Sequence, residues 1–227
     1  MSSPRLGRPP LVSRAGIVEA VLDVGFEQAT MAAVAAHLGV DSSTLYRHVD
    51  SRTDMLDAAA DLALRRAEWP VPPGGAGGWR PFLTTYAEGI WSLCERHPGL
   101  AVYLRSAQTV PPELVRHTLI VVAYLREALG FSVLDAAVIV DTVGDLTIDA
   151  FLIARQLAEQ PASVAGLARR YTELAEEIAR TDPAAALLAG EYLQVVTDAV
   201  AGVGGREQWW RRKLAYVLDG IETRIGR

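Results

Sequence analysis

Hydroxyl groups, a phenol and a guanidinium gather within a short stretch near the start of the chain. They belong to Ser43, Thr44, Tyr46 and Arg47 in the run DSSTLYRHV. Hydroxyl and guanidinium groups suit phosphate oxygens and the acceptor atoms of base edges, and a phenol suits a phosphate oxygen. These residue types at this spacing therefore indicate contact with a nucleic acid.

The residues around this cluster predict two helices joined by a tight turn. Thr30 is suited to cap the helix MAAVAAHL, and Gly39 ends it where a left-handed residue is needed. A further helix follows with the body STLYRHV, residues 43–49. Apolar contacts between the two helices are expected from Val34, Leu38 and Leu45. This is the spacing of a helix-turn-helix, whose second helix presents its outward side chains to a major groove about 12 Å wide.

An ordinary helical hairpin with solvated serine and threonine side chains shows similar spacing. The flanking residues favour DNA binding. Arg5 and Arg8 lie in a proline-interrupted basic arm that suits phosphates or the minor groove. Thr30 and Arg52 open the helices on either side of the reading pair, where hydroxyl, guanidinium and helix-end amide groups can hold a DNA backbone.

The elements that position this pair are also helical. A first helix is expected at about 13–24, with Gly25 as its stop. Ser51 and Asp54 form a capping box that opens a fourth helix, which runs to about Glu68.

The stretch WPVPPGGAGGWR, residues 69–80, concentrates proline and glycine and predicts a domain boundary. Strand signals are nearly absent, because apolar residues recur at intervals of three and four. We expect an all-α chain, with a three-helix helix-turn-helix domain and its basic arm in residues 1–68 and a helical bundle in residues 81–227. Helices of the bundle are expected at 81–97, 99–107, 112–129, 132–158, 162–180, 184–202 and 206–225.

Composition excludes several classes of protein. The chain has 227 residues and a formal net charge of −5, all of it carried beyond residue 52. Its longest apolar run, Leu119–Leu125, is far shorter than the roughly 20 residues of a membrane span. No signal-peptide pattern follows the first arginines, and Cys94 is the single cysteine. We expect a cytoplasmic protein with no membrane contact.

A helical enzyme is a competing class. It needs a base and a nucleophile, or a clustered set of metal ligands. The histidines are scattered, and no serine elbow, acidic metal motif or phosphate-binding glycine loop is visible. We therefore expect no catalytic residue, no metal and no cofactor.

The run from Gly7 to about residue 65 resembles the DNA-binding domain of the tetracycline-repressor (TetR) family of transcriptional regulators. The resemblance is most specific in GVDSSTLYRHVDSRTDML and in the basic arm ahead of the first helix. The usual pattern of the family is also present as TMAAVAAHLGV, residues 30–40. It departs from the family where members often have a lysine near Arg52, so Arg52 would carry any phosphate contact there. The resemblance implies that Ser43, Thr44, Tyr46, Arg47 and His48 lie on or beside the recognition helix.

Two of these residues carry a more specific expectation. The resemblance implies that Tyr46 and His48 meet phosphates. His48 has an equal alternative as a partly buried residue that packs between helices.

The remainder resembles the ligand-binding and dimerisation domain of the same family, especially the branch of the tetracycline repressor itself. The similar segments are RHPGLAVYLRS (96–106), ALGFSVLDAA (128–137) and LAYVLDGIETRI (214–225). The helices at 132–158 and 206–225 carry apolar stripes that would join two chains in a four-helix interface, or would form monomer core. Asp141, Asp145 and Asp149 interrupt the first stripe, as a solvated seam, interchain salt links or acids that face a ligand.

A ligand cavity is expected among the helices between residues 81 and 158. The candidate lining residues are mostly aromatic, with a few hydrogen-bonding groups: Tyr86, Ile90, Trp91, Cys94, Tyr103, His117, Tyr124 and Thr142. Each of them is also an ordinary core residue when taken singly. His97, before Pro98, is interpreted as a helix C-terminal cap.

These features predict a ligand-responsive transcriptional regulator, a repressor by default. A homodimer would hold a palindromic operator, and a small apolar or aromatic molecule would release it. One alternative is a DNA-binding dimer without a ligand, and another is a helical protein that only binds small molecules. A thermal shift on adding small apolar compounds is expected of the ligand-responsive regulator and not of the dimer without a ligand.

Overall fold

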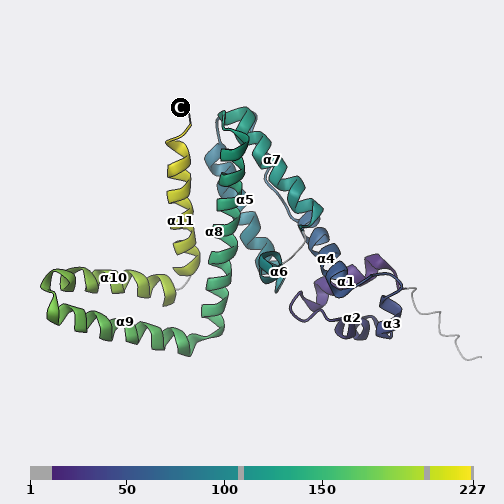
Figure 1. Cartoon of the computed structure of the whole chain (residues 1–227), viewed down its shortest axis with the longest axis horizontal. Helices are drawn as coiled ribbons and strands as arrows, with labels where there is room; N and C mark the ends of the chain where they lie inside the picture. Colours follow the sequence, from purple (N-terminus) through teal and green to yellow (C-terminus); the bar gives the residue numbers. More distant parts are fainter. Residues whose placement is uncertain (1–11, 107–109, 202–204, 226–227) are drawn as a thin grey trace, which may run out of the picture. The chain divides into compact units, whose positions relative to one another are not determined.

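The computed structural model describes residues 12–106, 110–201 and 205–225, and within these ranges it is helical without a strand (Figure 1). The all-α prediction is therefore confirmed. The helices are α1 (Arg14–Val24), α2 (Met31–Leu38), α3 (Ser42–Leu45), α4 (Arg52–Arg66), α5 (Trp79–Arg96), α6 (Leu100–Ser106), α7 (Pro112–Leu129), α8 (Val133–Glu159), α9 (Pro161–Thr181), α10 (Pro183–Ala201) and α11 (Gly205–Glu222).

Local side-chain caps begin the first helices where the sequence predicts them. The Oγ1 atom of Thr30 accepts a hydrogen bond from the amide of Ala33 at 3.0 Å, and the Ser51 hydroxyl accepts one from the amide of Asp54 at 3.1 Å. Gly39 ends α2 in the left-handed region, at φ 67°. These caps satisfy backbone groups that would otherwise lack a partner, so they fix where the helices begin and end.

The predicted length of the third helix is wrong. We expected helix over residues 43–49, whereas α3 is the four-residue helix Ser42–Leu45. Beyond it the backbone continues as turns, with the amide of His48 donating to the carbonyl of Leu45 at 2.8 Å. The apolar side chains of Leu45 and Val49 are both buried, and this anchors the turn at each end. Tyr46, Arg47 and His48 therefore lie just after the helix.

The described residues form two compact units. The N-terminal unit contains residues 12–68, 93–106 and 110–117, and the C-terminal unit contains residues 69–92, 118–201 and 205–225. The chain passes from one unit to the other at residue 69, and residues 93–106 and 110–117 group with the N-terminal helices. The domains expected at 1–68 and 81–227 stay a prediction.

Specific contacts explain why these later residues belong to the N-terminal unit. The amide of Phe26 donates to the carbonyl of Pro98 at 2.9 Å, and the Phe26 ring lies 5.6 Å from that of Tyr103. The Tyr103 hydroxyl is hydrogen-bonded to Asp57 on α4. Long-range packing of this kind has no local signal in the sequence, so a proline- and glycine-rich linker alone does not locate the unit boundary.

In the C-terminal unit α8 packs against α11, and α9 and α10 form an antiparallel hairpin (Figure 1). The core includes Trp210 of α11, whose indole is stacked on Trp91 with ring centroids 4.7 Å apart. The Trp210 indole nitrogen also donates to the hydroxyl of buried Thr147 at 3.2 Å. Among the described residues, no helix is long and apolar enough to cross a membrane.

Candidate nucleic-acid interface and ligand region

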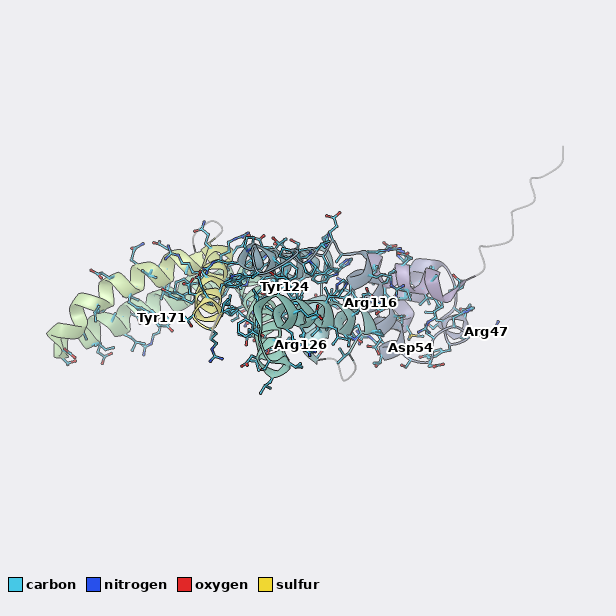
Figure 2. All side chains as sticks on the ribbon, turned by 90° about the horizontal axis from the view of Figure 1, so that it is seen from above. Arg47, Asp54, Arg116, Tyr124, Arg126 and Tyr171 are labelled. Carbon is cyan, nitrogen blue, oxygen red and sulfur yellow. The ribbon has the colours of Figure 1, made fainter. Side chains whose placement is uncertain are left out.

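The end of α3 and the turn after it present the predicted DNA-reading residues. Ser43 and Arg47 are exposed, and Tyr46 has 57% of its surface exposed. Arg47 lies at the outer edge of the N-terminal unit in Figure 2. Leu45 between them is fully buried, so the exposed polar side chains are carried on an anchored backbone. A protein that meets DNA needs this combination of exposed donors and a fixed frame.

A clamp between Arg14 and Asp54 holds this turn. The Arg14 guanidinium donates to the two carboxylate oxygens of Asp54 at 2.8 and 2.6 Å, and also to the backbone carbonyl of His48 at 3.0 Å. Asp54 further accepts a hydrogen bond from the amide of Asp50 at 2.9 Å. The clamp thus ties the first turns of α1 and α4 to the residues that follow α3.

The charges in this clamp depend on one another. The hydrogen bonds from Arg14 lower the pKa of Asp54 to about 2, so the carboxylate stays ionised at neutral pH. Bidentate pairing with an ionised carboxylate gives a fixed geometry as well as energy. Sequence reasoning missed the role of Arg14, because its partner lies 40 residues away and spacing along one helix cannot reveal it.

Arg52 makes a contact that the sequence did not predict. Its Nε atom donates to the carbonyl of Ala29 at 2.8 Å, and a terminal nitrogen donates to the carbonyl of Phe26 at 3.3 Å. The guanidinium thereby secures the loop between α1 and α2. A structural use of these donors competes with the predicted contact to a phosphate.

The other predicted DNA-binding residues differ in how exposed they are. Thr30 is exposed, and while its oxygen caps α2, its hydroxyl hydrogen is still able to donate. His48 is half-buried, in keeping with both of its predicted roles. Thr44 is also half-buried. Arg5 and Arg8 lie outside the described residues.

The comparison with known families matches this same part of the chain. Residues 12–59 match the model of the family described as "Bacterial regulatory proteins, tetR family". This part of the chain therefore carries the N-terminal domain of the TetR family. The match spans α1 to α3 and the first part of α4, and so contains both the exposed turn and the Arg14–Asp54 clamp.

Curated TetR-family relatives extend the similarity beyond this segment. The HTH-type transcriptional repressor DrrR1 of Streptomyces coeruleorubidus is 34% identical over 48% of this chain, which spans 42% of that relative's length. The class C tetracycline repressor protein of Escherichia coli is 28% identical over 90% of this chain and 86% of its own length. TetR-family proteins are transcriptional regulators rather than enzymes.

A solved structure shares the fold of the chain. It is the Streptomyces coelicolor TetR family protein ActR in complex with actinorhodin, with a TM-score of 0.76 and 19% identity over 96% of this chain and 99% of that one. At this identity the similarity shows the fold alone.

The predicted ligand residues are divided between the two units. The C-terminal unit holds Tyr86, Ile90, Trp91, Tyr124 and Thr142, and the N-terminal unit holds Cys94, Tyr103 and His117. Most of the aromatic members are buried, whereas Thr142 is exposed and its hydroxyl donates to the carbonyl of Val138 at 2.7 Å. The lining of an effector site by this set stays a prediction.

Several members of the set have well-defined surroundings. Burial raises the pKa of Tyr86 to about 12, against a hydrogen bond with Thr118 that lowers it. Burial also raises the pKa of the Cys94 thiol to about 12, which leaves the sulfur protonated. Burial lowers the pKa of His117, although Glu113 lies 3.4 Å from its Nε2 atom and opposes that effect.

Tyr124 lines a cavity of about 430 Å³ in the C-terminal unit. Its hydroxyl donates to the carbonyl of Gly75 at 3.0 Å, and its ring meets Phe82 edge-on at 5.0 Å. The wall also includes Pro72, Pro73 and Ile120. A tyrosine fixed in this way is preorganised for stacking.

Proposed function

We propose that the chain is a ligand-responsive transcriptional repressor that binds a palindromic operator as a homodimer. The observation that carries the proposal is the exposed turn Tyr46–Arg47, held by the Arg14–Asp54 clamp inside the segment that matches the family. Its donors suit phosphate oxygens and base edges. Because the protein would act on operator DNA, we expect it in the cytoplasm.

The outer face of α8 supports a homodimer. At about 100° per residue, Leu134, Val138 and Asp145 lie opposite the buried stripe that packs within the C-terminal unit. Leu134 is 73% exposed and Val138 is 56% exposed. Exposed apolar side chains on one helix face suit contact with a second copy of the chain better than contact with water. Two copies would set the half-site spacing at about 34–36 Å.

An effector follows from the TetR-family relationship and the aromatic composition of the predicted ligand region. ActR was solved in complex with actinorhodin. For this chain we propose a small, largely apolar or aromatic molecule as effector. An effector that prefers the arrangement that does not bind DNA lowers the affinity for the operator. Operator DNA then lowers the affinity for the effector by the same factor.

The direct test is binding of the purified protein to a labelled duplex from its own upstream region, with random duplex as competitor. We expect protection of a palindrome and a steep loss of affinity as salt is raised. Arg47→Ala should weaken specific binding about 10- to 100-fold. Arg126→Ala is the matched control, because Arg126 is an exposed arginine on α7 in the C-terminal unit (Figure 2).

The outcomes separate the alternatives. Equal affinity of Arg47→Ala and the parent protein for the palindrome would contradict the proposed interface. Specific binding that no small apolar or aromatic compound weakens would favour the dimer without a ligand. Sedimentation of Val138→Arg as a monomer, with Val102→Arg on α6 still dimeric, would support the α8 interface.

A further inference from the structure

A second cavity lies in the C-terminal unit, between α8, α10 and α11. Its volume is about 220 Å³. The wall from α8 is formed by Ala150, Ile153, Ala154 and Leu157, and α10 adds Val196. None of the residues predicted to bind the effector lines this cavity.

Two tryptophans of α11 form the opposite wall, Trp209 and Trp210. Trp210 is 1% exposed and is fixed by its stack on Trp91 and its hydrogen bond to Thr147. Trp209 is 37% exposed and stands closer to solvent. An indole wall facing alanines leaves a flat, apolar space, which suits an aromatic ring.

The charged residues that line this cavity are all basic. The two charged side chains that line it are Arg206 and Lys213. Arg206 donates to the carbonyl of Ala154 at 3.0 Å, so its guanidinium is engaged in the wall. Lys213 is exposed, and within the described ranges no acidic group pairs with it. An ammonium group at the rim of an apolar cavity favours a ligand with a negative end.

Two acidic side chains on α10 and α11 have partners of their own. Glu207 accepts from Arg211 at 2.6 Å. Asp198 accepts from the side-chain amide of Gln194 at 2.8 Å and lines an adjoining hollow with Arg212. Neither carboxylate lines the Trp209–Lys213 cavity, whose charged lining residues are both cations.

We propose that this cavity binds a small aromatic carboxylate, with its ring between Ala154 and the indoles and its carboxylate at Lys213. The volume lies below the range of about 300–1,000 Å³ that is common for drug-sized ligands, so one or two fused rings are expected. The cavity shares no lining residue with the predicted effector region.

The test uses 2-naphthoate as probe and 2-naphthalenemethanol as its uncharged counterpart. Binding of each compound to the purified full-length protein is measured by isothermal titration calorimetry at low salt. We expect 2-naphthoate to bind about tenfold more tightly, because only the carboxylate meets the ammonium group. The preference should shrink as salt is raised, since Lys213 is exposed.

Three variants locate the site. Lys213→Gln removes the charge and leaves a polar side chain one atom shorter, and should abolish the preference for the carboxylate. Arg212→Gln, which removes a neighbouring cation outside this cavity, should leave the preference intact. Ala154→Leu fills the space beside the indoles and should weaken both compounds. Circular dichroism checks that each variant is folded. If Ala154→Leu does not fold, Lys213→Gln still tests the proposal.

Several results would overturn the proposal. They are the absence of 2-naphthoate binding at millimolar concentration, an unchanged preference in Lys213→Gln, or a preference lost equally in Arg212→Gln. Binding that falls as protein concentration and dimer content rise would also overturn it, because the cavity would then be filled by a second copy of the chain.

Discussion

Arg14→Met should loosen the N-terminal unit while preserving most of the apolar stem of the side chain. The pKa of Asp54 falls from 3.8 to about 2 through its contact with Arg14, a difference worth about 2.4 kcal/mol at ~1.36 kcal/mol per pKa unit. Arg14 is 49% exposed and Asp54 is 26% exposed. Solvent screening at that exposure reduces the expected loss to about 1 kcal/mol.

The sign of the pH dependence follows from the lowered pKa. The folded protein holds Asp54 ionised more strongly than the unfolded chain does, so the pair stabilises the fold above about pH 4. This stabilisation is lost as pH falls toward about 2, where the folded carboxylate takes up its proton. The parent protein and Arg14→Met should therefore differ at pH 7 and converge near pH 2.

Two measurements check this reasoning. Hydrogen exchange of α1 and α4 at pH 7 should show protection about fivefold lower in Arg14→Met, the equivalent of ~1 kcal/mol. Carboxyl-carbon NMR should place the pKa of Asp54 near 4 in the variant. Arg66→Met is the control, because the Arg66–Glu19 pair also joins α1 to α4 but is more exposed, and little change is expected. Unchanged protection together with an unchanged Asp54 pKa in Arg14→Met would refute the role assigned to the clamp.

Three further results are expected. Cys94 is buried and its pKa is raised to about 12, so Ellman's reagent at pH 8 should modify it only as fast as the protein opens; rapid modification would contradict the structure. Gly99→Ala should lower the thermal midpoint by several degrees, because φ is +84° and a Cβ atom would lie 2.6 Å from the backbone nitrogen of Glu27. Trp210→Phe should cost about 1–2 kcal/mol in urea unfolding through loss of the bond to Thr147, and an unaltered midpoint would refute that estimate.

Local signals predicted the features that local interactions create. Thr30, Gly39 and Ser51 mark helix ends through hydrogen bonds that span only a few residues, and these positions were predicted correctly. The end of α3 was not, because Tyr46 and Arg47 are compatible with both a helix and a turn.

Contacts between distant residues account for what the sequence did not reveal. Arg14 reaches Asp54, and Arg52 reaches Ala29, through pairings that no periodicity encodes. The cavity beside Trp209 has the same cause, since it exists only where α8, α10 and α11 meet. In the sequence alone, the residues that line it form an ordinary apolar stripe followed by a cation.

Lys213 is the single lysine in a chain that otherwise uses arginine for its basic side chains. Apart from the terminal α-amino group, its ε-amine is therefore the one aliphatic amine of the protein, and it is exposed. A succinimidyl ester carrying a fluorophore would acylate one defined side chain without any engineering of the sequence. The same reaction, followed with and without 2-naphthoate, would report occupancy at that position as a change in labelling rate.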